Sequence, residues 1–289
     1  MSIKQALQQF GLDENLHFQQ SGTNPATQIG EKYVLKKFTK PEHAEKIATM
    51  HSLLIQENAA VAKHHMTRDG KPYATTDGGY YTLADKLPGA SVKIYEGDSQ
   101  KRVHSLGKGL GTLHRTLRKL DGKIDIHSMD SMGELYGWIL TEIRAKKIPV
   151  QQEVIDYCTE FSGLYNRLPR QIIHRDPHAG NFLFENDEVV GVVDFDFCQI
   201  NTRVFDICYA FAPVQEQFDQ WLAHRQSFLS GYQEISPLST DELAAYSYMS
   251  VFIELLFIAY WSTKNQAGRL KDSIKSTHWM YSIRDKLVL

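Results

Sequence analysis

The sequence predicts an α+β protein in which a β-rich amino-terminal part is followed by a larger, mostly helical part. Up to about residue 90, short runs of β-branched and aromatic residues alternate with polar turns, a pattern typical of strands. From Ser91 onward, apolar residues recur at spacings of three and four, as in amphipathic helices. A length of 289 residues suffices for one large or two small domains.

The first part contains two predicted helices and at least two predicted strands. Apolar side chains at helical spacing indicate a helix over 2–10, and 41–56 is expected to be a helix with Pro41 in its first turn. The run 32–38 predicts a strand. The run 80–89, which ends in Pro88-Gly89, predicts another.

The second part is expected to be helical around a short strand at 171–173. Helices are predicted over 103–117, near 132–147 and over 151–167. After Asp206 the chain is expected to be helical to its end, with breaks near Gly231 and at Ser236-Pro237. Three glycines in the first of these helices follow no strand, so they predict close helix packing rather than a phosphate loop: Gly107, Gly109 and Gly111.

Composition narrows the classes of partner. The net charge of −2 gives no indication of nucleic-acid binding. The cysteines are three in number and lack paired spacing, which suits reduced thiols in a cytoplasmic protein. No apolar run reaches the ~20 residues of a membrane span; the nearest, 251–261, contains Glu254 and predicts a buried helix, so no membrane association is expected.

The most informative segment is 172–181, together with 192–196. Asp176 is placed to take a proton from a hydroxyl, and Asn181 and Asp194 carry the oxygen ligands that Mg²⁺ prefers. Phosphoryl transfer requires mainly positioning and charge neutralisation from a protein, which three such groups supply.

A hairpin is predicted between the two metal-ligand candidates. The apolar runs 182–184 and 189–193 flank a polar turn at 185–188. Since a hairpin returns its ends to one place, we expect Asn181 and Asp194 to lie side by side.

These motifs resemble those of the aminoglycoside phosphotransferase and choline kinase family, small-molecule relatives of protein kinases. The resemblance rests on two segments, His174-Arg175-Asp176-Pro177-His178-Ala179-Gly180-Asn181 and Val193-Asp194-Phe195. It continues through 203–209 and 231–239, where the pattern is nearest to homoserine-kinase-like members, and it covers nearly the whole chain.

The resemblance implies a bilobal, protein-kinase-like fold. A small β-rich N-lobe, 1–86, would bind the nucleotide. A larger, mostly helical C-lobe, 87–289, would hold the catalytic loop, the metal site and the substrate-binding helices. The implied activity is Mg²⁺-dependent transfer of the γ-phosphate of ATP (or GTP) to a hydroxyl of a small molecule, such as an aminoglycoside or an amino alcohol. The oligomeric state is not indicated.

The resemblance also implies nucleotide-binding residues in the N-lobe. Lys36 shares a strand face with Val34 and is preferred over Lys37 as the phosphate-binding lysine. Of the helix carboxylates, Glu45 has the most usual spacing for pairing with Lys36, and an ordinary solvated glutamate is the alternative. The turn at Gly22 would lie over the phosphates, or be an ordinary hairpin loop. Adenine would contact the backbone from Ala84 to Lys86.

Several residues keep two interpretations. Arg175 is unusual for small-molecule kinases and is interpreted as a structural ion-pair partner. Asp196 either contacts a second Mg²⁺ or caps a turn, and Asp206 is expected to bind backbone amides of the catalytic loop. Glu254 would recognise a cationic amine if it faces the cleft; otherwise it pairs with a nearby Lys or Arg.

Three other functional classes share some of these sequence features. A catalytically silent kinase-like binding module is the main alternative, although such modules usually lack one of the residues that this chain retains. A protein kinase is less favoured because Asp-Phe-Gly and Ala-Pro-Glu segments are absent. A metallohydrolase is suggested by His174-x-Asp176-x-His178. It is disfavoured because the candidate ligands downstream, Asn181 and Asp194, offer oxygen atoms suited to Mg²⁺.

Overall fold

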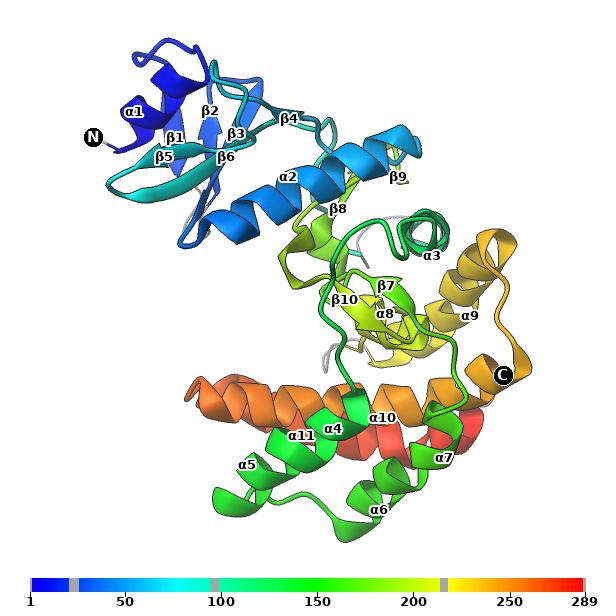
Figure 1. The fold of residues 1–289 in the computed structure, drawn as a ribbon. Coiled ribbons are helices and arrows are strands. Elements are labelled where there is room, and N and C mark those ends of the chain that lie inside the picture. The colour runs from blue at the N-terminus through cyan, green and yellow to red at the C-terminus, as the bar shows by residue number, and fades with distance from the viewer. Residues whose placement is uncertain (1, 21–25, 95–98, 214–217, 288–289) are drawn as a thin grey trace. The chain divides into compact units, whose positions relative to one another are not determined.

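The computed structural model describes residues 2–20, 26–94, 99–213 and 218–287 (Figure 1). It divides into two compact units. The first comprises Met1–Ser91, Gly122–Ile124 and Phe182–Asp196, and the second comprises the remainder. By internal contacts, therefore, the hairpin that follows the catalytic loop belongs to the amino-terminal unit.

The first unit is built on an antiparallel sheet. Its strands follow the order β1-β2-β3-β6-β4, with β5 also paired to β6. Residue 36 on β3 lies opposite residue 82 on β6, and Val34 lies opposite Ala84. The strand bounds are β1 Phe18–Gln20, β2 Ala26–Ile29, β3 Tyr33–Phe38, β4 His64–His65, β5 Ala74–Thr76 and β6 Gly79–Asp85.

Two helices and a separate hairpin complete this unit. α1 (Ser2–Gln9) contacts β5, whereas α2 (Pro41–Gln56) contacts β3, β4 and β6 (Figure 1). α2 begins and ends where the sequence predicts, with Pro41 in the first turn, where its missing N–H has no helical partner. The predicted hairpin is confirmed as β8 (Phe182–Glu185) and β9 (Glu188–Val192), whose ends pair as Phe182 with Val192.

The second unit is mainly helical. A two-stranded sheet, β7 (Gln171–Ile173) with β10 (Gln199–Asn201), carries the catalytic loop at the end of β7. The helices are α3 Ser99–Arg118, α4 Ser131–Glu134, the π-helix η1 Leu135–Ile139, α5 Leu140–Ala145, α6 Gln152–Glu160, α7 Ser162–Tyr165, α8 Arg203–Ala210, α9 Phe218–Ile235, α10 Thr240–Thr263 and α11 Ala267–Ser282. Short 3₁₀ turns are η2 Ala179–Asn181, η3 Phe195–Phe197 and η5 Arg284–Lys286.

α3 and α9 cross at glycines. A Cβ on Gly107 would lie 2.0 Å from the Phe228 carbonyl oxygen, and one on Gly231 would lie 2.1 Å from that of His104. The predicted close helix packing is thus confirmed for Gly107 and for Gly111. The predicted break near Gly231 is wrong, because this glycine serves the crossing and α9 continues to Ile235. The break at Ser236-Pro237 is confirmed.

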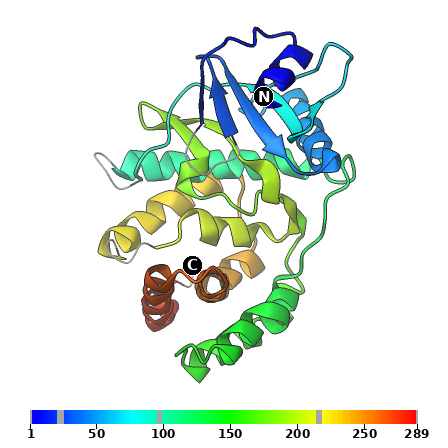
Figure 2. The same cartoon turned by 90° about the vertical axis from the view of Figure 1, so that its left-hand side faces the viewer.

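α10 is the central helix of the second unit and runs beside α11 (Figure 2). It begins with a capping box between Ser239 and Glu242. Within the described residues, it alone is long and apolar enough to cross a membrane by length and composition, yet 72% of its apolar window is buried. The predicted buried helix at 251–261 is therefore confirmed.

Candidate functional site

The catalytic loop follows β7 and presents Asp176 partly exposed, its side chain at 19%. The Asn181 side-chain amide donates to the Asp176 carbonyl oxygen at 2.8 Å and lies 3.4 Å from Oδ2 of the same residue. These bonds fix the Asn181 nitrogen, which leaves its Oδ1 as the atom available to a cation.

Asp206, fully buried at the start of α8, holds the loop in shape. Its carboxylate accepts the backbone N–H of His174 at 2.7 Å and that of Arg175 at 2.9 Å. The side chain of His114 lies 3.0 Å from it and is also 2.8 Å from the Tyr232 hydroxyl. The prediction that Asp206 binds backbone amides of the loop is confirmed.

Arg175 occupies a structural ion pair, as predicted. Its Nη2 contacts both carboxylate oxygens of Glu134, at 2.7 and 2.9 Å, and its guanidinium lies 3.8 Å from the ring centre of Phe205. Burial raises the pKa of Glu134 although the arginine opposes the shift. Arg175 has φ +71°, a left-handed conformation that is strained for a residue with a Cβ, and the two N–H bonds to Asp206 secure it.

Tyr209 is a site residue that the sequence analysis missed. Its hydroxyl donates to Oδ1 of Asp176 at 2.8 Å. Burial, and then the adjacent Asp176, raise the pKa of Tyr209, so this phenol keeps its proton and remains a donor. The spacing was an available signal, since Tyr209 lies three residues after Asp206 on one helix and therefore shares its face.

In the first unit, Lys36 forms a second polar centre. Its ammonium lies 2.8 Å from Oδ1 of Asp194 and 2.8 Å from Oδ1 of Asp196. Burial alone would lower the pKa of Lys36, but the two carboxylates outweigh it and the pKa is raised. Asp194 has φ +66°, which turns the backbone immediately after the hairpin.

The other predicted nucleotide residues that the structure describes form no ion pair or side-chain hydrogen bond with Lys36. Glu45 lies exposed on α2, and among the described residues the ion pairs of Lys36 go only to Asp194 and Asp196. The backbone N–H of Lys86 donates to the Lys32 carbonyl at 2.7 Å, while Ala84 lies within β6. Gly22 falls outside the described residues. The nucleotide contacts of these four residues stay predictions.

The donor set suits Mg²⁺. In the first unit, Asp194 and Asp196 supply carboxylate oxygens, the ligands that this hard cation prefers. Both carboxylates already converge on one positive charge, the Lys36 ammonium. No group of three or more His, Cys, Asp or Glu residues that could hold a metal ion occurs in the described part of the chain.

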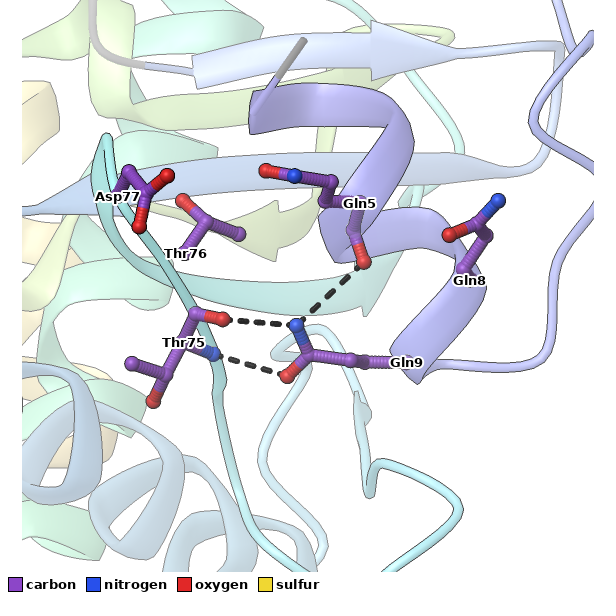
Figure 3. A pocket seen from close by; sticks show the side chains of 6 residues that line it. All are labelled: Gln5, Gln8, Gln9, Thr75, Thr76 and Asp77. Atoms are coloured by element: carbon purple, nitrogen blue, oxygen red, sulfur yellow. Dashed lines mark hydrogen bonds between the residues drawn. The ribbon is translucent and has the colours of Figure 1, made fainter.

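A polar pocket of about 400 Å³ lies elsewhere in the first unit, between α1 and β5 (Figure 3). The Gln9 side chain there mimics a strand: its amide N–H donates to the Thr75 carbonyl at 2.7 Å, and its oxygen accepts the Thr75 N–H at 3.0 Å. These bonds attach α1 to the sheet. None of the predicted site residues lines this pocket, so we assign it a structural origin.

Comparison with known proteins agrees with these features. A family model described as a phosphotransferase enzyme family matches residues 16–238. The homoserine kinase of Zymomonas mobilis is 27% identical over 224 residues, which cover 74% of this chain and 68% of that protein. The homoserine kinase of Neisseria meningitidis serogroup B is 25% identical over 228 residues, with coverage of 75% and 72%.

Solved structures confirm the fold class. A microcompartment-associated aminopropanol kinase superposes with a TM-score of 0.73 at 16% identity, covering 99% of this chain and 96% of that one. An amicoumacin kinase, solved with AMP-PNP and Ca²⁺, gives 0.66 at 20% identity, with coverage of 94% and 89%. The predicted protein-kinase-like α+β fold is thus shared with these enzymes.

Proposed function

The chain belongs to the phosphotransferase enzyme family, and we propose that, as a small-molecule kinase, it uses Asp176 to activate the acceptor hydroxyl for ATP-dependent phosphate transfer. The observation that carries this assignment is the hydrogen bonding of Asp176. Tyr209 occupies Oδ1 at 2.8 Å, whereas the contacts of Oδ2 are longer, 3.4 Å to the Asn181 amide nitrogen and 3.7 Å to Nε2 of His178. Oδ2 is therefore the oxygen better placed to accept a hydroxyl proton.

In the proposed reaction, the acceptor hydroxyl gives its proton to Oδ2 of Asp176, and its oxygen forms a new bond to the γ-phosphorus. The bond from that phosphorus to the β–γ bridging oxygen breaks, and ADP leaves. Because Tyr209 remains protonated, its hydrogen bond stabilises the carboxylate form that accepts the proton.

Lys36, Asn181 and Asp194 are proposed to serve the nucleotide. Mg²⁺, when bound, would neutralise phosphate charge, with the Asn181 Oδ1 and the Asp194 carboxylate as its protein ligands. The Lys36 ammonium, now paired with Asp194 and Asp196, would pair with phosphate oxygens as the carboxylates turn to the cation. Asp196 is then available as a further oxygen ligand.

The test separates nucleotide binding from chemistry. Asp176→Asn should keep the thermal stabilisation by Mg²⁺ and ATP and lose turnover by about 10²–10⁴, the usual contribution of a positioned general base. A ligand present at about 100 times its dissociation constant stabilises by roughly 2.7 kcal/mol, which is readily measured. GTP is run in parallel with ATP.

Asp194→Ala provides the complementary variant. It should lose the Mg²⁺-dependent part of the nucleotide shift, because the proposed cation ligand is removed. Undiminished turnover in Asp176→Asn would refute the base, and an unchanged Mg²⁺ response in Asp194→Ala would refute the metal ligand. Nucleotide binding without transfer to any acceptor would instead support a catalytically silent binding module.

A further inference from the structure

Glu254 is a buried carboxyl group that the proposed reaction does not use. It lies in the middle of α10, with only 3% of its surface exposed. Among the described residues it has no hydrogen-bond partner and no ion pair, and burial raises its pKa to about 8. The alternative of a pair with a nearby Lys or Arg is therefore not what the structure contains.

A buried carboxyl without a partner is costly in either protonation state. A carboxylate loses its hydration, and a neutral carboxyl group also leaves polar atoms unsatisfied. Native proteins usually provide such a group with a partner, and unexplained exceptions concentrate at functional sites. The residues around Glu254 therefore indicate what kind of partner it could bind.

Glu254 lies on the face of α10 that packs against α8. One turn before it, the Ser250 hydroxyl lies 3.5 Å from Sγ of Cys208. One turn after it, the ring of Phe257 lies 5.2 Å from the ring of Tyr209. Residues at these spacings share one side of a helix, so Glu254 lies between two contacts with the same neighbour.

Tyr209 connects this face to the proposed base. Its hydroxyl bonds Asp176, while its ring meets Phe257, one turn from Glu254. All four residues belong to the second unit. An aromatic pair and a carboxyl group thus follow one another along the helix surface that leads away from Asp176.

We propose that Glu254 is a specificity-determining residue that binds the protonated amine of the phosphate acceptor, so that the acceptor is an amino alcohol. This inference rests on the proposed function. The acceptor hydroxyl would lie at Asp176 and its ammonium group at Glu254, with the rings of Tyr209 and Phe257 beside the carbon chain and the charge.

The chemistry favours a cation over other groups. An ammonium supplies both the charge and the N–H donors that Glu254 lacks, and aromatic faces attract cations as well. The second hydroxyl of a neutral diol can donate one hydrogen bond to the carboxyl group but brings no charge, and an acceptor whose only charged group is a carboxylate would be repelled. Sites with buried polar groups discriminate strongly against analogues that leave those groups unpaired.

The first experiment uses the wild-type protein with matched acceptors. Phosphate transfer from ATP is measured with ethanolamine and 1-amino-2-propanol, and with their neutral counterparts ethylene glycol and 1,2-propanediol. We expect kcat/KM to favour the amines by on the order of 100-fold, the effect of removing one member of a buried charge pair. Equal use of the amine and the neutral alcohol would overturn the proposal.

The second experiment uses Glu254→Gln, which keeps the size of the side chain and removes its charge. The kcat/KM of this variant for the amines should fall by about the factor by which wild type prefers them, on the order of 100-fold. Transfer to the neutral alcohols should stay within a few-fold of wild type. Glu153→Gln, the same substitution at an exposed position on α6, is the matched control and should change neither. Retained amine preference in Glu254→Gln overturns the assignment.

The outcomes distinguish this proposal from the proposed function. Transfer to alcohols or sugars without amine preference leaves the kinase assignment intact and removes the role of Glu254. Absence of transfer to every acceptor, with or without an amine, refutes both. If Glu254→Gln fails to fold, the wild-type comparison of amine with neutral alcohol still decides.

Discussion

The glycine crossing of α3 and α9 makes a quantitative prediction about stability. Gly231→Ala would place a Cβ 2.1 Å from the His104 carbonyl oxygen and 3.2 Å from the Lys108 nitrogen. Carbon atoms prefer separations of about 3.5–4.0 Å, so the two helices would have to move apart by roughly 1 Å or more. The obstructing atoms belong to the backbone of α3, which no side-chain rotation can relieve.

The magnitude follows from two opposing effects. Overpacking in a well-packed core costs about 1–3 kcal/mol, and a contact with backbone belongs at the upper end. Alanine is about 1 kcal/mol better than glycine inside a helix, which partly offsets the strain. We therefore expect Gly231→Ala to reduce the free energy of unfolding by about 2 kcal/mol, the difference between roughly 3 and 1.

Urea unfolding followed by circular dichroism measures this change. Gly268→Ala in α11 is the control, because beyond its chain neighbours and its own helix backbone no described atom lies within 4 Å of its Cβ position. It should be neutral or stabilising by up to about 1 kcal/mol. If Gly231→Ala proves as stable as wild type or more so, the close approach of α3 and α9 is refuted.

Three further predictions concern polar contacts. Tyr209→Phe should lower kcat while leaving the thermal shift with Mg²⁺ and ATP unchanged, since the lost hydrogen bond orients Asp176; an unchanged kcat would contradict the positioning role. Lys36→Met should raise the KM for ATP more than the KM for the acceptor in steady-state kinetics, because the lysine is assigned to the phosphates. Burial opposes ionisation of Glu242, but hydrogen bonds from Arg203 lower its pKa below the ordinary value of 4.5. Its stabilising contribution is therefore present above about pH 4.5 and lost as the pH falls further, and Glu242→Gln should flatten the acid limb of a Tm–pH curve.

The sequence predicted the local elements of the catalytic region well, because each has a short-range cause. Pro41 fixes the start of α2, and a polar turn between two apolar runs specifies the hairpin at 182–192. The anchoring of the loop by Asp206 followed from the motif. Such signals depend on a few neighbouring residues, so periodicity and turn chemistry are sufficient to find them.

What the sequence could not predict depends on tertiary packing. Glycine is a poor helix former, so Gly231 was expected to interrupt its helix. Instead α9 continues through it, because only a glycine leaves room for the backbone of α3 at this crossing. Glu45 was the expected partner of Lys36 by spacing, whereas Asp194 and Asp196 are nearer in space. Whether Glu254 had a partner depended on the residues of neighbouring helices, which no local pattern specifies.

Glu254 also predicts an unusual dependence of stability on pH. Its pKa rises from an ordinary 4.5 to about 8 on folding, so the folded protein holds the proton more tightly than the unfolded chain. Stability from this group is therefore complete below about pH 4.5 and is lost as the pH rises through 8. A pKa shift of this size corresponds to a loss in the free energy of unfolding on the order of 5 kcal/mol across this pH range. This figure is an upper bound, because relaxation of the site would reduce it.

The comparison of wild type with Glu254→Gln isolates this effect. The variant cannot ionise, so its free energy of unfolding should exceed that of wild type increasingly between pH 5 and 8.5. The other titratable groups are common to both proteins. On the packed helices α6 and α8, burial raises the pKa of Cys208 and of Tyr157 to about 12 and raises that of Tyr209 as well. A pH-independent difference would show that Glu254 is not buried as the structure has it.

An amine ligand should reverse this trend. When the ammonium of 1-amino-2-propanol binds, Glu254 releases its proton and the charge pair replaces the neutral group. The thermal shift produced by the amine in wild type should therefore grow from pH 6 to 8.5, and 1,2-propanediol should produce no such growth. The same dependence in Glu254→Gln would place the amine at another residue, since the variant has no proton to release.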